Sequence, residues 1–234
     1  MNLNKPNNFP KIVHMIYIPW NSKTGILKDD EFEFDHTFYN NFKKNNPEWK
    51  VILWTLSKIN KFISDYYLEY AIIWTLIKHP VQVVDFIRLL VVYHYGGIYW
   101  EYKSTQKTLL DNFIPSENKN IKLFVETIID KNFSIKMKNE IIRNNKPEEY
   151  IRVAFHCFAT YAKNDFINYC IKKSLNNLNK YTVINQYDIL YIGGNAMITE
   201  AYHEVDRKNI ELIFDTNKYL SAYSIGSWRM KSYT

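Results

Sequence analysis

The stretch Pro80–Ser104, PVQVVDFIRLLVVYHYGGIYWEYKS, decides the fold of this chain of 234 residues. It contains a long apolar run, two adjacent glycines and a second, shorter run. Proline suits the first turn of a helix, where no amide partner is needed, and glycine ends helices because it tolerates left-handed dihedrals. The sequence therefore predicts an apolar helix that begins at Pro80, a break at Gly96 and Gly97, and a short strand directly after it.

Two charged residues interrupt this apolar helix. Asp85 and Arg88 are three positions apart and therefore share one helical face. In the strand that follows, Tyr99, Glu101 and Lys103 alternate and also share a face. An ion pair within the helix is the simplest interpretation of an isolated D-x-x-R. Charges in an apolar helix are costly unless polar groups meet them, so we expect both sets to converge on a polar pocket at a sheet edge.

The order D-x-x-R, apolar run, Y-G-G-I-Y and acidic triplet resembles the DXD sugar-transferase family of fungal initiating α-mannosyltransferases, which is related to the glucosylating clostridial toxins. The resemblance implies a single α/β domain over residues 1–234, with a GT-A-like (Rossmann-like) fold in which helices flank a mixed central sheet. It also implies that Asp85 holds ribose and sugar hydroxyls and that Arg88 holds sugar or phosphate. Tyr99 and Glu101 would line the donor site.

The metal motif of that family is altered in this chain. The family's Asp-x-Asp triplet carries a divalent cation, but here the triplet reads Glu101-Tyr102-Lys103, at the family's spacing from Asp85. A lysine in place of the second carboxylate exchanges a cation holder for a cation. We therefore expect no metal cofactor, with Mn²⁺ or Mg²⁺ held through Glu101 as the alternative.

Two further segments resemble the same family. Residues 11–18, KIVHMIYI, read as the first strand, and Tyr17 stands where the family's aromatic residue stacks on the uracil of the donor. Residues 223–231, YSIGSWRMK, resemble a closing segment that folds over the donor phosphates. The resemblance implies that Ser227 and Trp228 bind the leaving diphosphate. The expected nucleotide-sugar site thus combines residues 11–18, 80–104 and 223–231.

The rest of the chain alternates between strand and helix patterns. Strands are expected at 49–55, 122–129 and 150–159, and helices at 27–45, 56–78 and 165–178. The excursion at 130–150 is the expected acceptor side, because loops vary without disturbing the core.

The composition limits the classes of protein to which this chain can belong. A hydrophobic fraction of 47% is ample for one core, and no run of apolar residues is long enough to span a membrane. The polar N-terminus shows no secretory signal, so we expect a soluble cytoplasmic protein. Cys157 and Cys170 have no metal-binding spacing and read as buried thiols. The net charge of +6 admits a polyanionic partner, but no nucleic-acid-binding motif is present.

The sequence therefore predicts a hexosyltransferase that uses a UDP-sugar, with UDP-glucose a candidate, and that retains the anomeric configuration without a metal. The acceptor, glycan or protein, is left open. One alternative is an inactive pseudo-glycosyltransferase that binds nucleotide-sugar, and a distant one is a basic nucleic-acid-binding protein. The expected catalytic residues are Arg88, Glu101 and Lys103, and the expected substrate-binding residues are Tyr17, Asp85, Tyr99, Ser227 and Trp228.

Overall fold

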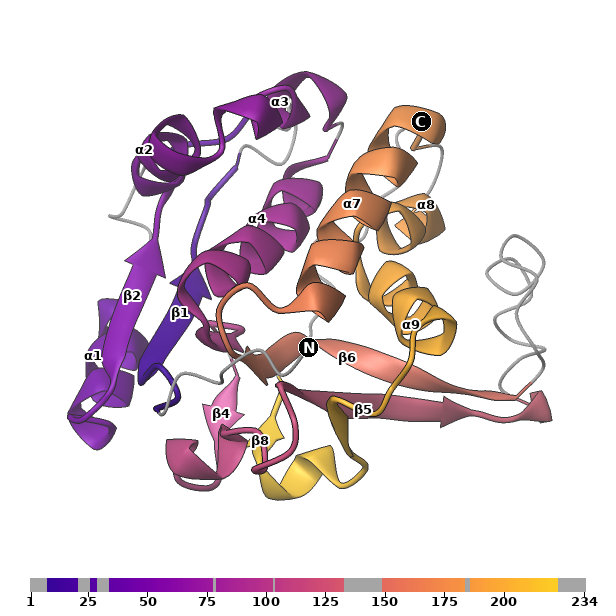
Figure 1. Ribbon diagram of the computed structural model, residues 1–234. Helices are drawn as coiled ribbons and strands as arrows, with labels where there is room; N and C mark the ends of the chain where they lie inside the picture. Colours follow the sequence, from indigo (N-terminus) through magenta and orange to yellow (C-terminus); the bar gives the residue numbers. More distant parts are fainter. Residues whose placement is uncertain are drawn as a thin grey trace.

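A mixed β-sheet forms the centre of the molecule (Figure 1). The computed structural model describes residues 8–20, 26–28, 34–77, 79–102, 104–132, 149–183 and 186–222. In this part of the chain the six strands lie in the order β2 (Lys50–Trp54), β1 (Ile12–Ile16), β3 (Gly97–Trp100), β6 (Tyr150–Thr160), β5 (Ile121–Ile129) and β7 (Ile210–Ile213). β1 is parallel to β2 and β3, β6 is antiparallel to β3 and β5, and β7 is parallel to β5.

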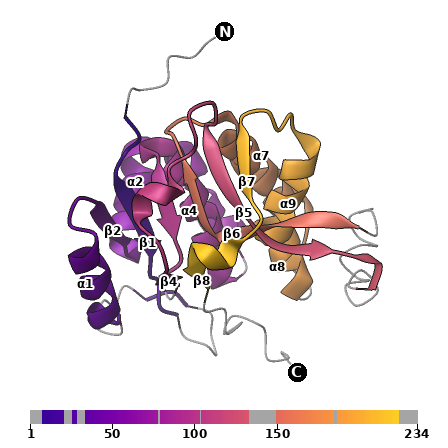
Figure 2. The same ribbon diagram turned by 90° about the horizontal axis from the view of Figure 1, so that it is seen from below.

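Helices cover both faces of this sheet (Figures 1 and 2). One face carries α2 (Leu56–Tyr66), α3 (Ile73–Leu76), α4 (Pro80–Tyr95), α7 (Asp165–Lys180), α8 (Gln186–Ile192) and α9 (Asn195–Glu204). The other face carries α1 (His36–Asn45), the short 3₁₀ segments η3 (Leu110–Phe113) and η4 (Thr216–Lys218), and a small sheet of β4 (Thr105–Gln106) with β8 (Leu220–Ser221). A third 3₁₀ segment, η2 (Leu68–Tyr70), links α2 to α3. Each face has its own cluster of buried apolar side chains.

The helix α4 is buried along most of its length, and its two ends are fixed by local chemistry. At the start, the backbone N–H of Val81 donates to His79 Nδ1 at 3.2 Å, and Pro80 occupies the first turn. At the end, Gly96 and Gly97 have φ angles of +67° and +98°, which side chains with a Cβ rarely adopt. Because α4 turns directly into β3 there, its first half lies beside the carboxyl end of β3.

The α/β class and the mixed sheet flanked by helices are confirmed. The helix expected at 27–45 is shorter than predicted, because α1 begins only after Asp35, whose side chain caps the N–H groups of Thr37 and Phe38. The segment 56–78 divides into α2, η2 and α3. Cys157 and Cys170 are free and buried, as predicted. None of the helices within the described ranges is long and apolar enough to cross a membrane.

Candidate active site

A buried ion pair on α4 is the starting point of the site. Arg88 Nη2 lies 2.8 Å from Asp85 Oδ1, and both side chains are only 7% exposed. The pair therefore satisfies itself, as an isolated D-x-x-R would, but it also reaches the sheet. Arg88 Nη1 donates to the carbonyl oxygen of Phe155 on β6 at 2.5 Å. The charge of α4 is thus also bound by β6, a contact that the sequence did not predict.

The guanidinium of Arg88 lies between two aromatic rings. Its Cζ atom is 4.5 Å from the ring centre of Tyr99 on β3 and 4.5 Å from that of Phe155 on β6. Aromatic faces attract cations, most strongly where water is excluded. Together with the ion pair and the carbonyl contact, the two rings hold this guanidinium in one orientation.

Glu101 completes the polar cluster at the carboxyl end of β3. The hydroxyl of Tyr99 donates to Glu101 Oε2 at 3.2 Å, and Arg88 Nη1 lies 3.7 Å from the same oxygen. The Glu101 side chain is 36% exposed, so it is the member of the cluster that meets solvent. The structure therefore brings together four of the predicted residues, Asp85, Arg88, Tyr99 and Glu101.

Burial shifts the protonation equilibria of this cluster. Desolvation raises the pKa of Asp85 to about 7, although the charge of Arg88 acts in the opposite direction. Burial also raises the pKa of Tyr99 well above its ordinary value. The phenol of Tyr99 therefore stays protonated and donates, while Asp85 titrates close to neutral pH.

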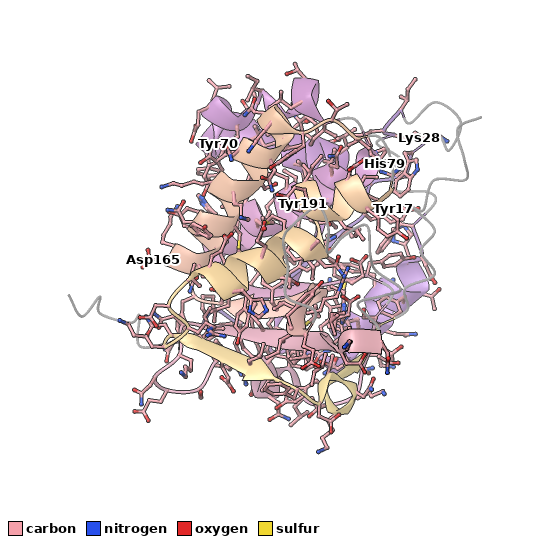
Figure 3. The ribbon with its side chains drawn as sticks, turned by 90° about the vertical axis from the view of Figure 1, so that its right-hand side faces the viewer. Tyr17, Lys28, Tyr70, His79, Asp165 and Tyr191 are labelled. Atoms are coloured by element: carbon pink, nitrogen blue, oxygen red, sulfur yellow. The ribbon has the colours of Figure 1, made fainter. Side chains whose placement is uncertain are left out.

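Tyr17 lies at the same edge of the sheet, just beyond the end of β1. The pairing of His14 with Tyr99 in the parallel β1–β3 ladder brings Tyr17 level with Tyr102. The rings of these two tyrosines are 5.5 Å apart, and Tyr17 also meets the ring of Phe34 at 5.0 Å. Figure 3 shows Tyr17 toward the same side of the molecule as His79, which caps α4. Its aromatic setting suits base stacking, although its role stays a prediction.

The turn between α8 and α9 packs against Asp85. A Cβ atom on Gly194 would lie 2.9 Å from the Cα of Leu190 and 3.3 Å from Asp85 Oδ2, so the backbone contact with Leu190 favours glycine at this position beside Asp85. Asn195, the neighbour of Gly194, begins α9 and accepts a hydrogen bond from Arg152 Nη2 at 2.9 Å.

Arg152 belongs to a second polar cluster that sequence reasoning missed. Its Nε donates to Glu126 Oε2 at 2.7 Å, and the amide of Asn195 donates to the same carboxylate oxygen at 2.7 Å. The register between β5 and β6 shifts between Val125 and Thr127, so Glu126 is an extra residue in the ladder. No local signal in the sequence marks such a bulge.

His156 is also placed beside the site. Its carbonyl oxygen accepts a hydrogen bond from the backbone N–H of Glu101 at 2.8 Å. Its Nε2 atom is buried without a hydrogen-bond partner. Burial, aided by the charge of Arg88, lowers the pKa of His156 to about 4, so the imidazole is neutral at ordinary pH.

The remaining predicted residues lie outside the described part of the chain. These are Lys103, Ser227 and Trp228, with the closing segment 223–231 and most of the excursion at 130–150.

Of the family's cation triplet, the structure describes one carboxylate, that of Glu101. Within the described ranges, no group of three or more His, Cys, Asp and Glu side chains is placed to hold a metal. Glu101 is one carboxylate, already bound by Tyr99, and the sequence has Lys103 where a second carboxylate would stand. Mg²⁺ is commonly held by one or two carboxylates together with substrate phosphates and waters, so Glu101 is the minimal protein ligand set for such an ion.

Comparison with known families defines the class of this segment. Residues 33–120 match the model of the glycosyltransferase sugar-binding region containing a DXD motif. The match includes α4 and β3, with Asp85, Arg88, Tyr99 and Glu101. The resemblance drawn from the sequence is therefore confirmed.

Individual relatives agree with this class. The chain is similar to mannosyl phosphorylinositol ceramide synthase SUR1 of Saccharomyces cerevisiae, with 31% identity over 99 residues that make up 41% of this chain and 22% of the relative. It is also similar to inositol phosphoceramide mannosyltransferase 1 of Schizosaccharomyces pombe, with 28% identity over 41% of this chain and 29% of the relative. The chain thus matches less than a third of the length of either protein.

A comparison with solved structures gives a partial alignment with one glycosyltransferase. The structure of PaToxG Glycosyltransferase aligns with 84% of this chain and 69% of its own, with a TM-score of 0.49 and 16% sequence identity.

Proposed function

We propose that this chain is a retaining glycosyltransferase that transfers a hexose from a UDP-sugar without a metal ion. One observation carries the proposal: the Asp85–Arg88 pair of α4 meets Tyr99 and Glu101 at the carboxyl edge of the parallel strands. In open α/β sheets, ligands bind beyond the carboxyl ends of the strands. The match of residues 33–120 to a DXD-type sugar-binding region supports a donor sugar at this edge.

Each residue has a role that its surroundings support. Asp85 presents a buried carboxyl group that can accept from ribose and sugar hydroxyls. Arg88 is fixed by Asp85, Phe155 and two ring faces, so it can hold a sugar or phosphate oxygen without losing side-chain freedom on binding. Glu101 is the more exposed carboxylate, directed by Tyr99, at the rim of the site.

Hexosyl transfer separates charge in a way that sets the demands on the site. The bond between the anomeric carbon and the diphosphate oxygen breaks, so positive charge develops on the carbon and negative charge on the departing diphosphate. The acceptor oxygen then bonds to that carbon on the same face and gives its proton to the departing diphosphate oxygen. Fixed cationic groups stabilise the leaving diphosphate where no metal is available. We assign this role to Lys103, with Ser227 and Trp228 as hydrogen-bond donors.

The sugar is the least constrained part of the proposal. The family resemblance makes UDP-glucose a candidate, while the names of the two fungal relatives specify mannosyl transfer. A thermal-shift panel of UDP-glucose, UDP-galactose, UDP-N-acetylglucosamine and GDP-mannose separates these options, because a ligand of the native state raises the melting temperature.

Metal independence is tested with EDTA and with Lys103→Ala. We expect donor hydrolysis to continue in EDTA and to fall by more than about tenfold in Lys103→Ala, since a preorganised charge on the leaving group is worth a few kcal/mol. Arg207→Ala is the matched control, a cation stacked on Tyr202 of α9. Full dependence on Mn²⁺ with a harmless Lys103→Ala would instead favour metal binding through Glu101.

A second candidate is a pseudoenzyme that binds nucleotide-sugar without turnover. The altered cation triplet favours it, because the metal-binding carboxylates are incomplete. Calorimetry with UDP, followed by an overnight assay of UDP-sugar hydrolysis, distinguishes the two. Binding without any hydrolysis would identify the pseudoenzyme.

A further inference from the structure

A groove of about 490 Å³ lies at the other edge of the sheet from the candidate active site. It is formed where β6 ends and where β5 and β7 begin, and it includes the first turn of α7. Thr160 of β6 pairs with Gly97 of β3 and with Ile121 of β5. These pairings place the groove level with the start of β3. Figure 3 shows Asp165, which lines this groove, on the opposite side of the molecule from Tyr17.

The groove has an apolar floor and a polar rim. Phe166 and Ile210 are buried at 7% exposure each, and Tyr161 and Tyr169 add aromatic surface. The volume lies within the range of about 300–1,000 Å³ that small-molecule sites occupy. Aromatic rings pack well against the C–H face of a pyranose while polar groups bind its hydroxyls.

Three side chains of the rim are free to bind a ligand. The carboxamides of Asn120 and Asn209 and the carboxylate of Asp165 make no hydrogen bond with other residues of the described chain, although the backbones of Asn120 and Asn209 are joined at 2.9 Å. A carboxamide offers two donors and two acceptor lone pairs. Vicinal sugar hydroxyls need that mixture of donors and acceptors.

The charges of the rim argue against an anionic ligand. Asp165 is acidic, Asp206 is paired with Lys208 at 3.0 Å, and the ammonium of Lys163 is directed to the rings of Tyr93 and Tyr67, at 4.6 Å and 5.8 Å. A phosphate or a nucleotide would therefore meet the carboxylate of Asp165. An uncharged, polyhydroxylated ligand meets free amides and aromatic carbon instead.

The backbone is also unusual at this place. Lys163 has a φ angle of +57°, and it is the only residue other than glycine with a positive φ in the described chain. Its N–H donates to the carbonyl oxygen of Tyr93 at 2.7 Å, which fixes the loop against α4. A left-handed lysine is a strained backbone conformation, and such strain tends to persist at binding sites.

We propose that this groove is a glycan-binding site, separate from the candidate active site, which holds sugar units of an oligosaccharide distant from the reacting end. The proposal goes beyond hexosyl transfer itself, because it concerns a surface that touches no residue assigned to the donor. It predicts that neutral oligosaccharides bind the chain whether or not a nucleotide-sugar is present.

The test uses ligand-observed NMR with maltotriose, cellotriose and α-linked mannotriose as probes. We expect wild type to bind one of them with millimolar affinity. The double variant Asn120→Ala, Asn209→Ala should weaken that binding at least about fivefold, since each amide contributes hydrogen bonds to a neutral ligand. The matched control is Asn179→Ala, an exposed amide on α7 whose Nδ2 donates to the carbonyl of Leu175.

Donor hydrolysis is measured on the same variants and should not change. Absence of binding by all three trisaccharides, or binding that the double variant leaves intact, overturns the proposal. Binding of a trilysine peptide with displacement of the trisaccharide also overturns it, because the rim would then select cations. Trisaccharide binding in a protein without donor hydrolysis would reject the transferase function and leave the groove standing.

Discussion

The titration of Asp85 gives the most direct test of the buried cluster. Burial raises its pKa from 3.8 to about 7 even with Arg88 beside it. Asp85→Asn keeps the shape of the side chain and removes the titration. The comparison of wild type with this variant therefore isolates one ionisation in a molecule with many others.

The expected magnitude follows from the linkage between protonation and folding. A pKa difference of about three units corresponds to on the order of 4 kcal/mol. Below about pH 4 the Asp85 carboxyl group is protonated in both the folded and the unfolded chain, so it costs nothing. As pH rises to about 7, the unfolded chain loses this proton first and the folded state loses stability. Above the folded pKa the effect is complete.

The prediction therefore concerns how the free energy of unfolding changes with pH. The free energy of unfolding of wild type, minus that of Asp85→Asn, should fall by a few kcal/mol between about pH 4 and pH 8. The pH-independent difference in the free energy of unfolding between the two proteins depends on how Arg88 tolerates the loss of its partner. Breaking a buried pair typically costs about 3–5 kcal/mol, and that difference changes little with pH because the pKa of Arg88 is raised above its already high ordinary value.

Urea denaturation at a series of pH values measures this difference. Asp65→Asn is the control, because Asp65 forms an exposed pair with Lys61 on α2. Parallel pH profiles for wild type and Asp85→Asn would refute the reasoning, since Asp85 would then titrate alike in the folded and unfolded chains. The same variant should lose donor affinity, and retained affinity would remove Asp85 from the site.

Two further substitutions test neighbouring parts of the site. Tyr17→Ala should weaken UDP binding about tenfold, while Tyr17→Trp should retain it, because stacking requires a ring face. Calorimetry measures both affinities. Equal affinities for wild type and the two variants would exclude stacking. Gly194→Ala should lower both the melting temperature and the donor affinity, because its Cβ would lie 2.9 Å from the Cα of Leu190 and 3.3 Å from Asp85 Oδ2. Gly193→Ala is the milder control, since a Cβ atom there would meet a serine hydroxyl at 3.1 Å. An equal loss of melting temperature and donor affinity in both variants would show that Gly194 has no special contact with Asp85.

The central helix and its charged face were predictable because their causes are local. Pro80, Gly96 and Gly97 act on the backbone within a few residues of themselves, and the spacing of Asp85 and Arg88 sets their shared face. The alternation of a strand then brought Tyr99 and Glu101 to the same edge. The family match confirms the resemblance on which the role of this segment rests.

The contributions of β6 were not predictable because they depend on strand pairing. The Phe155 carbonyl that binds Arg88 carries no signal in the sequence, since every residue has one. The bulge that turns Glu126 toward Arg152 arises from a register shift between two strands. The late start of the helix expected at 27–45 had a local cause, but the cap at Asp35 was hidden within a polar amphipathic pattern.

Charge balance connects the buried cluster to the proposed metal-free transfer. With Asp85 ionised, the described cluster holds two carboxylates, Asp85 and Glu101, against the single guanidinium of Arg88. A diphosphate placed beside this cluster would meet net negative charge, so a cation must come from elsewhere. A proton on Asp85 relieves part of the excess, because its raised pKa keeps that proton available near neutral pH. Lys103, the second residue after Glu101, is the nearest cation along the chain that can supply the remainder.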